Sequence, residues 1–218
     1  MTARAGARRL LVGVCGSGNL LALPQHLLAV RAHGEVVIHA VMTRSAAGIL
    51  PPGTLRLLCD EVSCDGADEL TAGHVQLATW ADQVVVLPAT ANMLGQAAHG
   101  LASGLLSSTL LAVETPILFF PAMNRRMWTR PAVRRNVATL REDGHVVVQP
   151  AVGQAWEIAT HSMQPNPGLP APAATAAVIA ARLWPGEPGS PAGESTPGGV
   201  AASGDPAAPV LLPGPSLR

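Results

Sequence analysis

Short apolar runs alternate with helical patterns along most of this chain, and this alternation constrains the fold more than any other feature. The runs expected to form strands are residues 10–14, 36–42, 83–87, 117–120 and 145–149, with a shorter candidate at 61–64. Helical patterns are found at residues 20–33, 92–101, 105–113, 131–143 and 172–183. Runs this apolar are typical of strands covered on both faces. We therefore predict an α/β fold with a doubly wound parallel sheet.

The length and the composition of the carboxyl-terminal segment divide the chain into a domain and a tail. The chain has 218 residues, which is enough for one domain with a full hydrophobic core. From Pro185 onward Gly and Pro dominate without a collagen-like period, and such a composition is typical of disorder. We expect one domain over residues 1–184 and a disordered tail over residues 185–218.

Charge and cysteine content exclude several classes of protein. Lys+Arg and Asp+Glu both number 14 and form no block of like charge, so the electrostatic footprint of a nucleic-acid-binding protein is missing. The apolar run at residues 10–15 is too short for a secretion signal or a membrane span. Cys15, Cys59 and Cys64 argue against a disulfide framework and lack metal-ligand spacing. We expect a cytoplasmic protein without metal, membrane or nucleic-acid partners.

Hydroxyl and glycine residues follow the first two apolar runs. Gly16, Ser17 and Gly18 come after the first run, and Thr43 and Ser45 flank Arg44 after the second. Backbone N–H groups and hydroxyls in such turns can hold a phosphate. Position 21 is Leu, so the dinucleotide-binding glycine pattern is absent. A mononucleotide phosphate site and ordinary turn chemistry both explain these residues.

A segment of small residues follows the run at 83–87. Its residues are Pro88, Ala89, Thr90, Ala91, Asn92 and Met93. Small side chains let a flat ring approach the backbone, and Asn92 is expected to cap the next helix and to hydrogen-bond a ring edge.

The octet Pro121-Ala122-Met123-Asn124-Arg125-Arg126-Met127-Trp128 begins where the apolar run at 117–120 ends. An Asn at the end of a buried strand is suited to holding a carboxylate. The alternative is a strand-to-helix loop in which Met123, Met127 and Trp128 fill core space. Arg125 and Arg126 either assist carboxylate recognition or face solvent.

His74 opens the segment His74-Val75-Gln76-Leu77-Ala78-Thr79-Trp80-Ala81-Asp82, directly before the run at 83–87. A neutral imidazole near pH 7 can accept a proton from a thiol. The alternative is a structural or exposed histidine.

Taken in order, these segments resemble the motifs of the flavin-containing cysteine decarboxylases. The octet is similar to the family's Pro-x-Met-Asn-x-x-Met-Trp motif, and the His74 segment to His-x-x-Leu-Ala-x-Trp-Ala-Asp. The small-residue segment is similar to the flavin-binding Pro-Ala-Ser-Ala-Asn-Thr motif, with Thr90 and Met93 as departures. Ser103-Gly104 departs further, because the family has an acidic pair there, before the hydroxyls of Ser107, Ser108 and Thr109. The resemblance covers residues 10–160.

The resemblance implies a Rossmann-like fold that binds FMN near a subunit interface, in a homotrimer or an assembly of trimers such as a dodecamer. It implies catalytic roles for His74 and Asn124. The cofactor contacts that it implies are Gly16, Ser17, Gly18, Thr43, Ser45, Pro88, Ala89, Thr90, Ala91 and Asn92. The substrate contacts that it implies are Met123, Asn124, Met127, Trp128 and Trp156.

A missing cysteine distinguishes two branches of the family. Enzymes of coenzyme A synthesis carry an Ala-Cys-Gly type segment late in the chain, whereas this chain has Gln154-Ala155-Trp156-Glu157-Ile158-Ala159-Thr160 and no Cys after Cys64. The resemblance therefore implies oxidative decarboxylation of the C-terminal cysteine of a ribosomal precursor peptide, which feeds aminovinyl-cysteine formation in lanthipeptide antibiotic biosynthesis. That peptide and other enzymes of its pathway are the candidate partners. The alternatives are phosphopantothenoylcysteine decarboxylation, a non-catalytic flavin-binding regulatory subunit and, more weakly, a flavin prenyltransferase.

Overall fold

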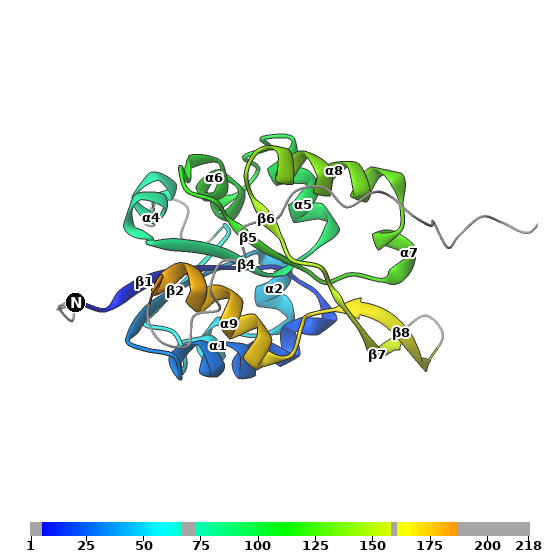
Figure 1. Cartoon of the computed structure of the whole chain (residues 1–218), viewed down its shortest axis with the longest axis horizontal. Helices are drawn as coiled ribbons and strands as arrows, with labels where there is room; N and C mark the ends of the chain where they lie inside the picture. Colours follow the sequence, from blue (N-terminus) through cyan, green and yellow to red (C-terminus); the bar gives the residue numbers. More distant parts are fainter. Residues whose placement is uncertain (1–5, 67–72, 158–160, 187–218) are drawn as a thin grey trace, which may run out of the picture.

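A six-stranded parallel sheet forms the centre of the protein (Figure 1). The computed structural model describes residues 6–66, 73–157 and 161–186. The strands are β1 (Arg8–Val14), β2 (Val36–Met42), β3 (Glu61–Cys64), β4 (Gln83–Ala89), β5 (Leu118–Pro121) and β6 (Val146–Val147). Their spatial order is β3-β2-β1-β4-β5-β6. The direction of winding reverses between β1 and β4, and ligands of such sheets bind at the carboxyl ends of these strands.

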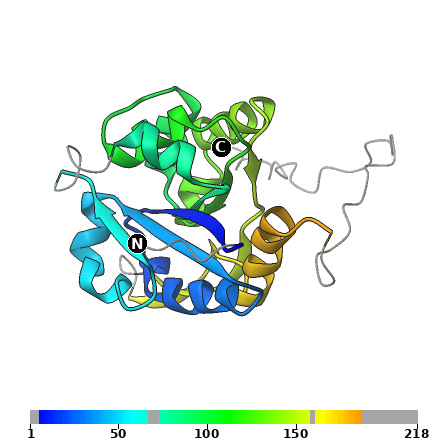
Figure 2. The same ribbon diagram turned by 90° about the vertical axis from the view of Figure 1, so that its left-hand side faces the viewer.

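Helices cover both faces of the sheet, with α1 and α6 on opposite sides (Figures 1 and 2). Within the described residues, each helix is too short or too polar to cross a lipid bilayer. The helices are η1 (Gly18–Ala22, a 3₁₀ turn), α1 (Leu23–Arg31), α2 (Arg44–Ile49), α3 (Pro52–Leu55), α4 (His74–Trp80), α5 (Ala91–Ala98), α6 (Leu105–Ala112), α7 (Arg125–Trp128), α8 (Pro131–Glu142) and α9 (Pro172–Leu183).

The central strands bury both of their faces, as the apolar runs predict. Leu10 and Val12 of β1 point into the core beneath α1 and α9, whereas Leu11 points into the core beneath α5, α6 and α8. Phe119 and Phe120 of β5 divide between these two cores in the same way. Because successive side chains of a strand point to opposite faces, a continuous apolar run can serve both layers. The predicted doubly wound parallel sheet is confirmed.

A β-hairpin beyond the sheet was missed by the sequence analysis. Strand β7 (Ala151–Glu157) pairs antiparallel with β8 (Ser162–Gly168). Pro165 and Pro167 argue against a strand in sequence, because proline cannot donate to a sheet ladder. In a two-stranded sheet each strand has an open edge, where a residue without an N–H is tolerated. Most of the predicted tail, residues 187–218, lies outside the described residues.

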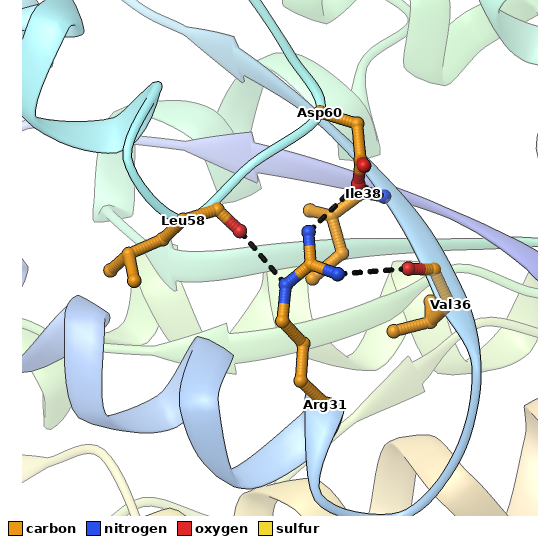
Figure 3. Close-up of polar contacts among 5 residues, drawn as sticks. All are labelled: Arg31, Val36, Ile38, Leu58 and Asp60. Atoms are coloured by element: carbon orange, nitrogen blue, oxygen red, sulfur yellow. Dashed lines mark hydrogen bonds and ion pairs between the residues drawn. The ribbon is translucent and has the colours of Figure 1, made fainter.

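An arginine and an aspartate join helix α1 to the amino ends of β2 and β3 (Figure 3). The Arg31 guanidinium donates to the carbonyl oxygens of Leu58 and Val36, at 2.9 and 3.0 Å, and to Asp60 Oδ2 at 2.7 Å. Asp60 Oδ2 also accepts the Ile38 N–H at 2.8 Å. Burial raises the pKa of Asp60, but the Ile38 N–H and the Arg31 cation outweigh burial and leave the pKa below its ordinary value.

Removal of this carboxylate should destabilise the fold in a pH-dependent way. A carboxyl group whose pKa is lowered by folding stabilises the protein above its unfolded pKa, and this stabilisation is lost as the pH falls through the folded pKa. We expect Asp60→Ala to lower the free energy of unfolding by about 1 kcal/mol at neutral pH. Urea denaturation at about pH 7 and about pH 3 should show that the deficit shrinks in acid, near the ordinary carboxyl pKa. An equal deficit at both pH values would contradict a role for the charge.

Candidate active site

A cavity of about 940 Å³ lies at the carboxyl ends of the parallel strands. Its walls come from the segments that follow β1, β2, β3, β4 and β5, and from the β7–β8 hairpin. Doubly wound sheets bind their ligands at this position, and the volume is near the upper end of the range for small-molecule sites, roughly 300 to 1,000 Å³. The predicted site residues in the lining are Gly16, Ser17, Gly18, Thr43, Ser45, Thr90, Ala91, Asn92, Met123, Asn124 and Met127.

The loops after β1 and β2 touch each other at one edge of the cavity. A Cβ atom on Gly16 would lie 2.7 Å from the Cβ of Ser45 and 2.9 Å from its carbonyl carbon, so glycine is required for this approach. Ser17 Oγ accepts the Asn19 N–H at 3.2 Å and caps η1, and Thr43 Oγ1 accepts the Ala46 N–H at 3.2 Å and caps α2. The turn chemistry considered from sequence is therefore present, and it occurs inside the cavity wall.

Some residues of the small-residue segment after β4 line the wall of the cavity, and others are buried beneath its floor. Thr90 Oγ1 accepts the Met93 N–H at 3.3 Å and caps α5. The prediction that Asn92 caps this helix is wrong, because Asn92 lies within the first turn, where it is exposed and lines the cavity. Pro88 and Ala89 are buried beneath, and Pro88 follows a cis peptide bond.

The octet after β5 forms the opposite wall and is joined to the hairpin. Asn124 Oδ1 accepts the Arg126 N–H at 2.7 Å and caps α7, and Asn124 lines the cavity. The Arg125 N–H donates to Asn166 Oδ1 of β8 at 3.3 Å. Trp128 packs instead against the core beneath α8, as the core-filling interpretation predicts for it. Arg125 and Arg126 are exposed.

Pro88, Ala89 and Trp128 are thus not part of the described lining, and two further predicted residues do not join these walls in the described structure. His74 is the first residue of α4, is exposed, and is not part of the cavity lining. Trp156 belongs to β7, and its side chain lies outside the described part of the structure.

The cavity also contains a buried thiol at its floor. Burial raises the pKa of Cys15 to about 12, although hydrogen bonds with Thr90 oppose this shift. The thiol therefore stays protonated near neutral pH and is a packing group. Among the described residues, no group of three or more His, Cys, Asp or Glu side chains could hold a metal ion.

Sequence reasoning missed several polar residues of the cavity, notably Asp65, Gln96 and Asn166. Asp65 follows β3 directly, so its position at a carboxyl strand end was a usable signal. Asn166 had no such signal, because the hairpin that carries it was not predicted. Arg44 is the cation and Asp65 the anion among the described lining residues.

Comparisons with known proteins agree with this arrangement. The family model described as Flavoprotein matches residues 2–169. Mersacidin decarboxylase of Bacillus sp. (strain HIL-Y85/54728) is 40% identical over 166 residues, which are 76% of this chain and 85% of that protein. The structure of MrsD from Bacillus sp. HIL-Y85/54728 has a TM-score of 0.70 at 35% identity and covers 81% of this chain and 96% of its own.

A second solved structure, the FMN-dependent cysteine decarboxylase SpaF, has a TM-score of 0.66 at 39% identity and covers 82% of this chain and 99% of its own. The family model spans most of the chain, and both relatives cover well over two thirds of it. The chain therefore belongs to the Flavoprotein family and is a flavin-dependent decarboxylase of that family.

Proposed function

We propose that this protein oxidatively decarboxylates the C-terminal cysteine of a ribosomally made precursor peptide and releases a peptidyl aminoenethiol. The observation that carries the proposal is the convergence of the Asn124 loop, the Gly16 loop and the Thr90 segment on one cavity. The similarity to mersacidin decarboxylase, over 85% of that protein, supports the same chemistry. In this proposal the product feeds an aminovinyl-cysteine ring in lanthipeptide antibiotic biosynthesis, together with other enzymes of the pathway.

FMN is the cofactor, and the cavity has groups that suit both the phosphate and the flat ring of FMN. At one edge, the close loops of Gly16 and Ser45 offer backbone N–H groups and hydroxyls for a phosphate, with Ser17, Gly18 and Thr43 beside them. At the other edge, Thr90, Ala91 and Asn92 leave room for a flat ring above the buried Pro88 and Ala89. We assign the FMN contacts to these residues.

Substrate chemistry in this proposal is divided between Asn124 and His74. The Asn124 amide donates to the terminal carboxylate and orients the cysteine, and Met123, Met127 and Trp156 form the substrate wall, whereas Trp128 packs in the core. His74 accepts the thiol proton. Bound FMN supplies the two-electron oxidation, by accepting a hydride from the cysteine β-carbon. The thioaldehyde that remains draws in the electron pair of the breaking bond to the carboxylate, so carbon dioxide leaves and an enethiolate forms.

The exposed position of His74 bears on the assembly of the enzyme. His74 opens α4 and does not line the cavity of its own chain. We propose that His74 serves the cavity of a neighbouring subunit in a homotrimer or an assembly of trimers. Phosphopantothenoylcysteine decarboxylation is the alternative reaction, and the absence of cysteine after Cys64 counts against it.

The reaction can be tested with synthetic peptides that end in cysteine. Incubation with the FMN-loaded enzyme should lower the peptide mass by about 46 Da, the sum of carbon dioxide and two hydrogens. The two hydrogens leave as a hydride taken by the flavin and a proton lost by the thiol. Mass spectrometry measures this loss. Peptides that end in serine are the matched control and should keep their mass. A loss of about 44 Da alone would contradict the oxidative step.

The roles of Asn124 and His74 can be distinguished by two substitutions that keep the fold. Asn124→Asp retains the oxygen that caps α7 but replaces the NH₂ donor with a negative charge, so it should repel the carboxylate and lower kcat/KM at least about 100-fold. His74→Asn should lower kcat with the thermal midpoint unchanged, because the residue is exposed. Mixed assemblies of the two variants should regain activity if each site uses both subunits. Absence of recovery would contradict the shared site. An unchanged biological effect of the His74→Asn variant would favour a regulatory flavoprotein without turnover.

The phosphate-binding loops can be tested by cofactor affinity alone. Gly16→Ala forces the added Cβ against Ser45 and separates the two loops, so the dissociation constant of FMN should rise roughly 5- to 100-fold, as overpacking of this kind predicts. Quenching of flavin fluorescence during titration of the apoprotein measures the constant. Gly48→Ala is the matched control, because its Cβ would meet no atom within 4 Å. Equal constants for both variants would argue against this assignment of the phosphate end.

A further inference from the structure

Helix α6 begins at the cavity without a capping side chain of its own. Its N-cap residue is Gly104, whose backbone is extended, with φ −165° and ψ 178°. Ser103 and Gly104 precede the helix, and neither of them supplies a side-chain cap. The first N–H groups of a helix need acceptors, and Asp or Asn commonly supplies one at the N-cap. In this chain the acceptor has to come from another residue.

A carboxylate from a distant part of the chain supplies that acceptor. Asp65 Oδ1 accepts the Leu106 N–H at 3.1 Å, across 41 residues of sequence. The backbone of Asp65 is itself fixed, because its N–H donates to Met42 O of β2 at 2.9 Å. Ser107 completes the turn, since its Oγ accepts the Gly104 N–H at 3.0 Å. Asp65 thus joins the end of β3 to the beginning of α6.

The glycine and the aspartate fit together sterically. A Cβ atom on Gly104 would lie 3.0 Å from Asp65 Oδ2 and 3.1 Å from its Cγ, closer than ordinary contact. Any side chain at position 104 would therefore crowd the carboxylate. An acidic side chain there would also repel it, because like charges at such a distance disfavour each other. Gly104 and Asp65 are thus two parts of one arrangement.

The same turn of α6 is a wall of the cavity. Asp65, Ser103, Gly104 and Ser107 all line it. Leu106 lies behind the wall, where its fully buried side chain fills the space over Gly13 of β1. The N–H of Leu106 is held by Asp65 while its side chain is held by the sheet. The position of this wall relative to the cavity therefore depends on Asp65.

We propose that Asp65 is a positioning residue for FMN, which caps α6 from the segment after β3 and so holds the Ser103 to Ser107 wall in place. The inference deepens the proposed function, since it rests on the assignment of this cavity to the cofactor. The wall in this proposal is part of the cofactor site, so the strength of the Asp65 hydrogen bond contributes to the affinity for FMN.

Asp65→Ala should weaken FMN binding in a folded protein. Loss of a helix cap reduces the stability of the turn that FMN needs, so the dissociation constant should rise by roughly 5- to 10-fold. Flavin fluorescence titration of the apoprotein measures the constant, and the fine structure of the visible flavin absorption band reports the rigidity of the site. Asp60→Ala is the matched control: it removes a carboxylate that accepts the Ile38 N–H of β2, away from the cavity, and should lower stability without changing the constant.

A second substitution tests whether the carboxylate acts through α6. Gly104→Asp in the Asp65→Ala background returns a carboxylate to the N-cap and should restore most of the affinity. Gly104→Asp alone should weaken binding, because it crowds Asp65. Asp65→Asn keeps an acceptor oxygen, so its dissociation constant for FMN should stay within about 3-fold of that of the parent. This variant is the one to measure if Asp65→Ala fails to fold. An unchanged constant in folded Asp65→Ala, or no recovery in the double variant, would overturn the proposal. Neither measurement uses a peptide, so a failure of the decarboxylation assay would leave the result on Asp65 intact.

Discussion

Backbone hydrogen bonds at the carboxyl ends of β1, β4 and β5 hold the site together. The Cys15 N–H donates to Pro88 O at 3.3 Å, and the Ala122 N–H donates to Ala89 O at 2.9 Å. These bonds continue the sheet ladder by one step into the loops, so the Gly16 loop, the Thr90 segment and the Asn124 loop begin at fixed positions. Buried backbone groups must be paired, and here the pairing also builds the cavity floor.

Above this floor, most of the cavity wall consists of helix beginnings. Ser17, Thr43, Thr90 and Asn124 each cap a helix with a side-chain oxygen and each line the cavity. The capping atoms of these residues are therefore engaged with the backbone at the edge of the cavity. Stability and ligand binding thus share the same side chains, and a substitution that removes a cap changes both. Asp65 extends this principle to α6, where the capping oxygen comes from the segment after β3.

The fold was predictable from local pattern to a large extent, and the site only in part. The runs at 36–42 and 61–64 coincide with β2 and β3, because burial on both faces leaves a clear apolar signal. The helical pattern at 20–33 divides into η1 and α1, since Ser17 starts a 3₁₀ turn before Pro24 begins a regular helix. The short helices, such as α2 of six residues and α7 of four, were not anticipated, because so few residues show no helical period. Their first turns are instead fixed by the caps Thr43 and Asn124.

The sequence by itself determined which residues follow each strand, and hence that Ser17, Thr43, Thr90 and Asn124 would meet at one edge of a parallel sheet. The tertiary structure alone decided that Asn166 of the hairpin holds the Arg125 N–H and that His74 is exposed outside its own cavity. It also decided the pairing of Asp65 with Gly104. The physical reason is range: strand ends and caps are set by neighbours in sequence, whereas these contacts join residues tens of positions apart and depend on how the layers pack.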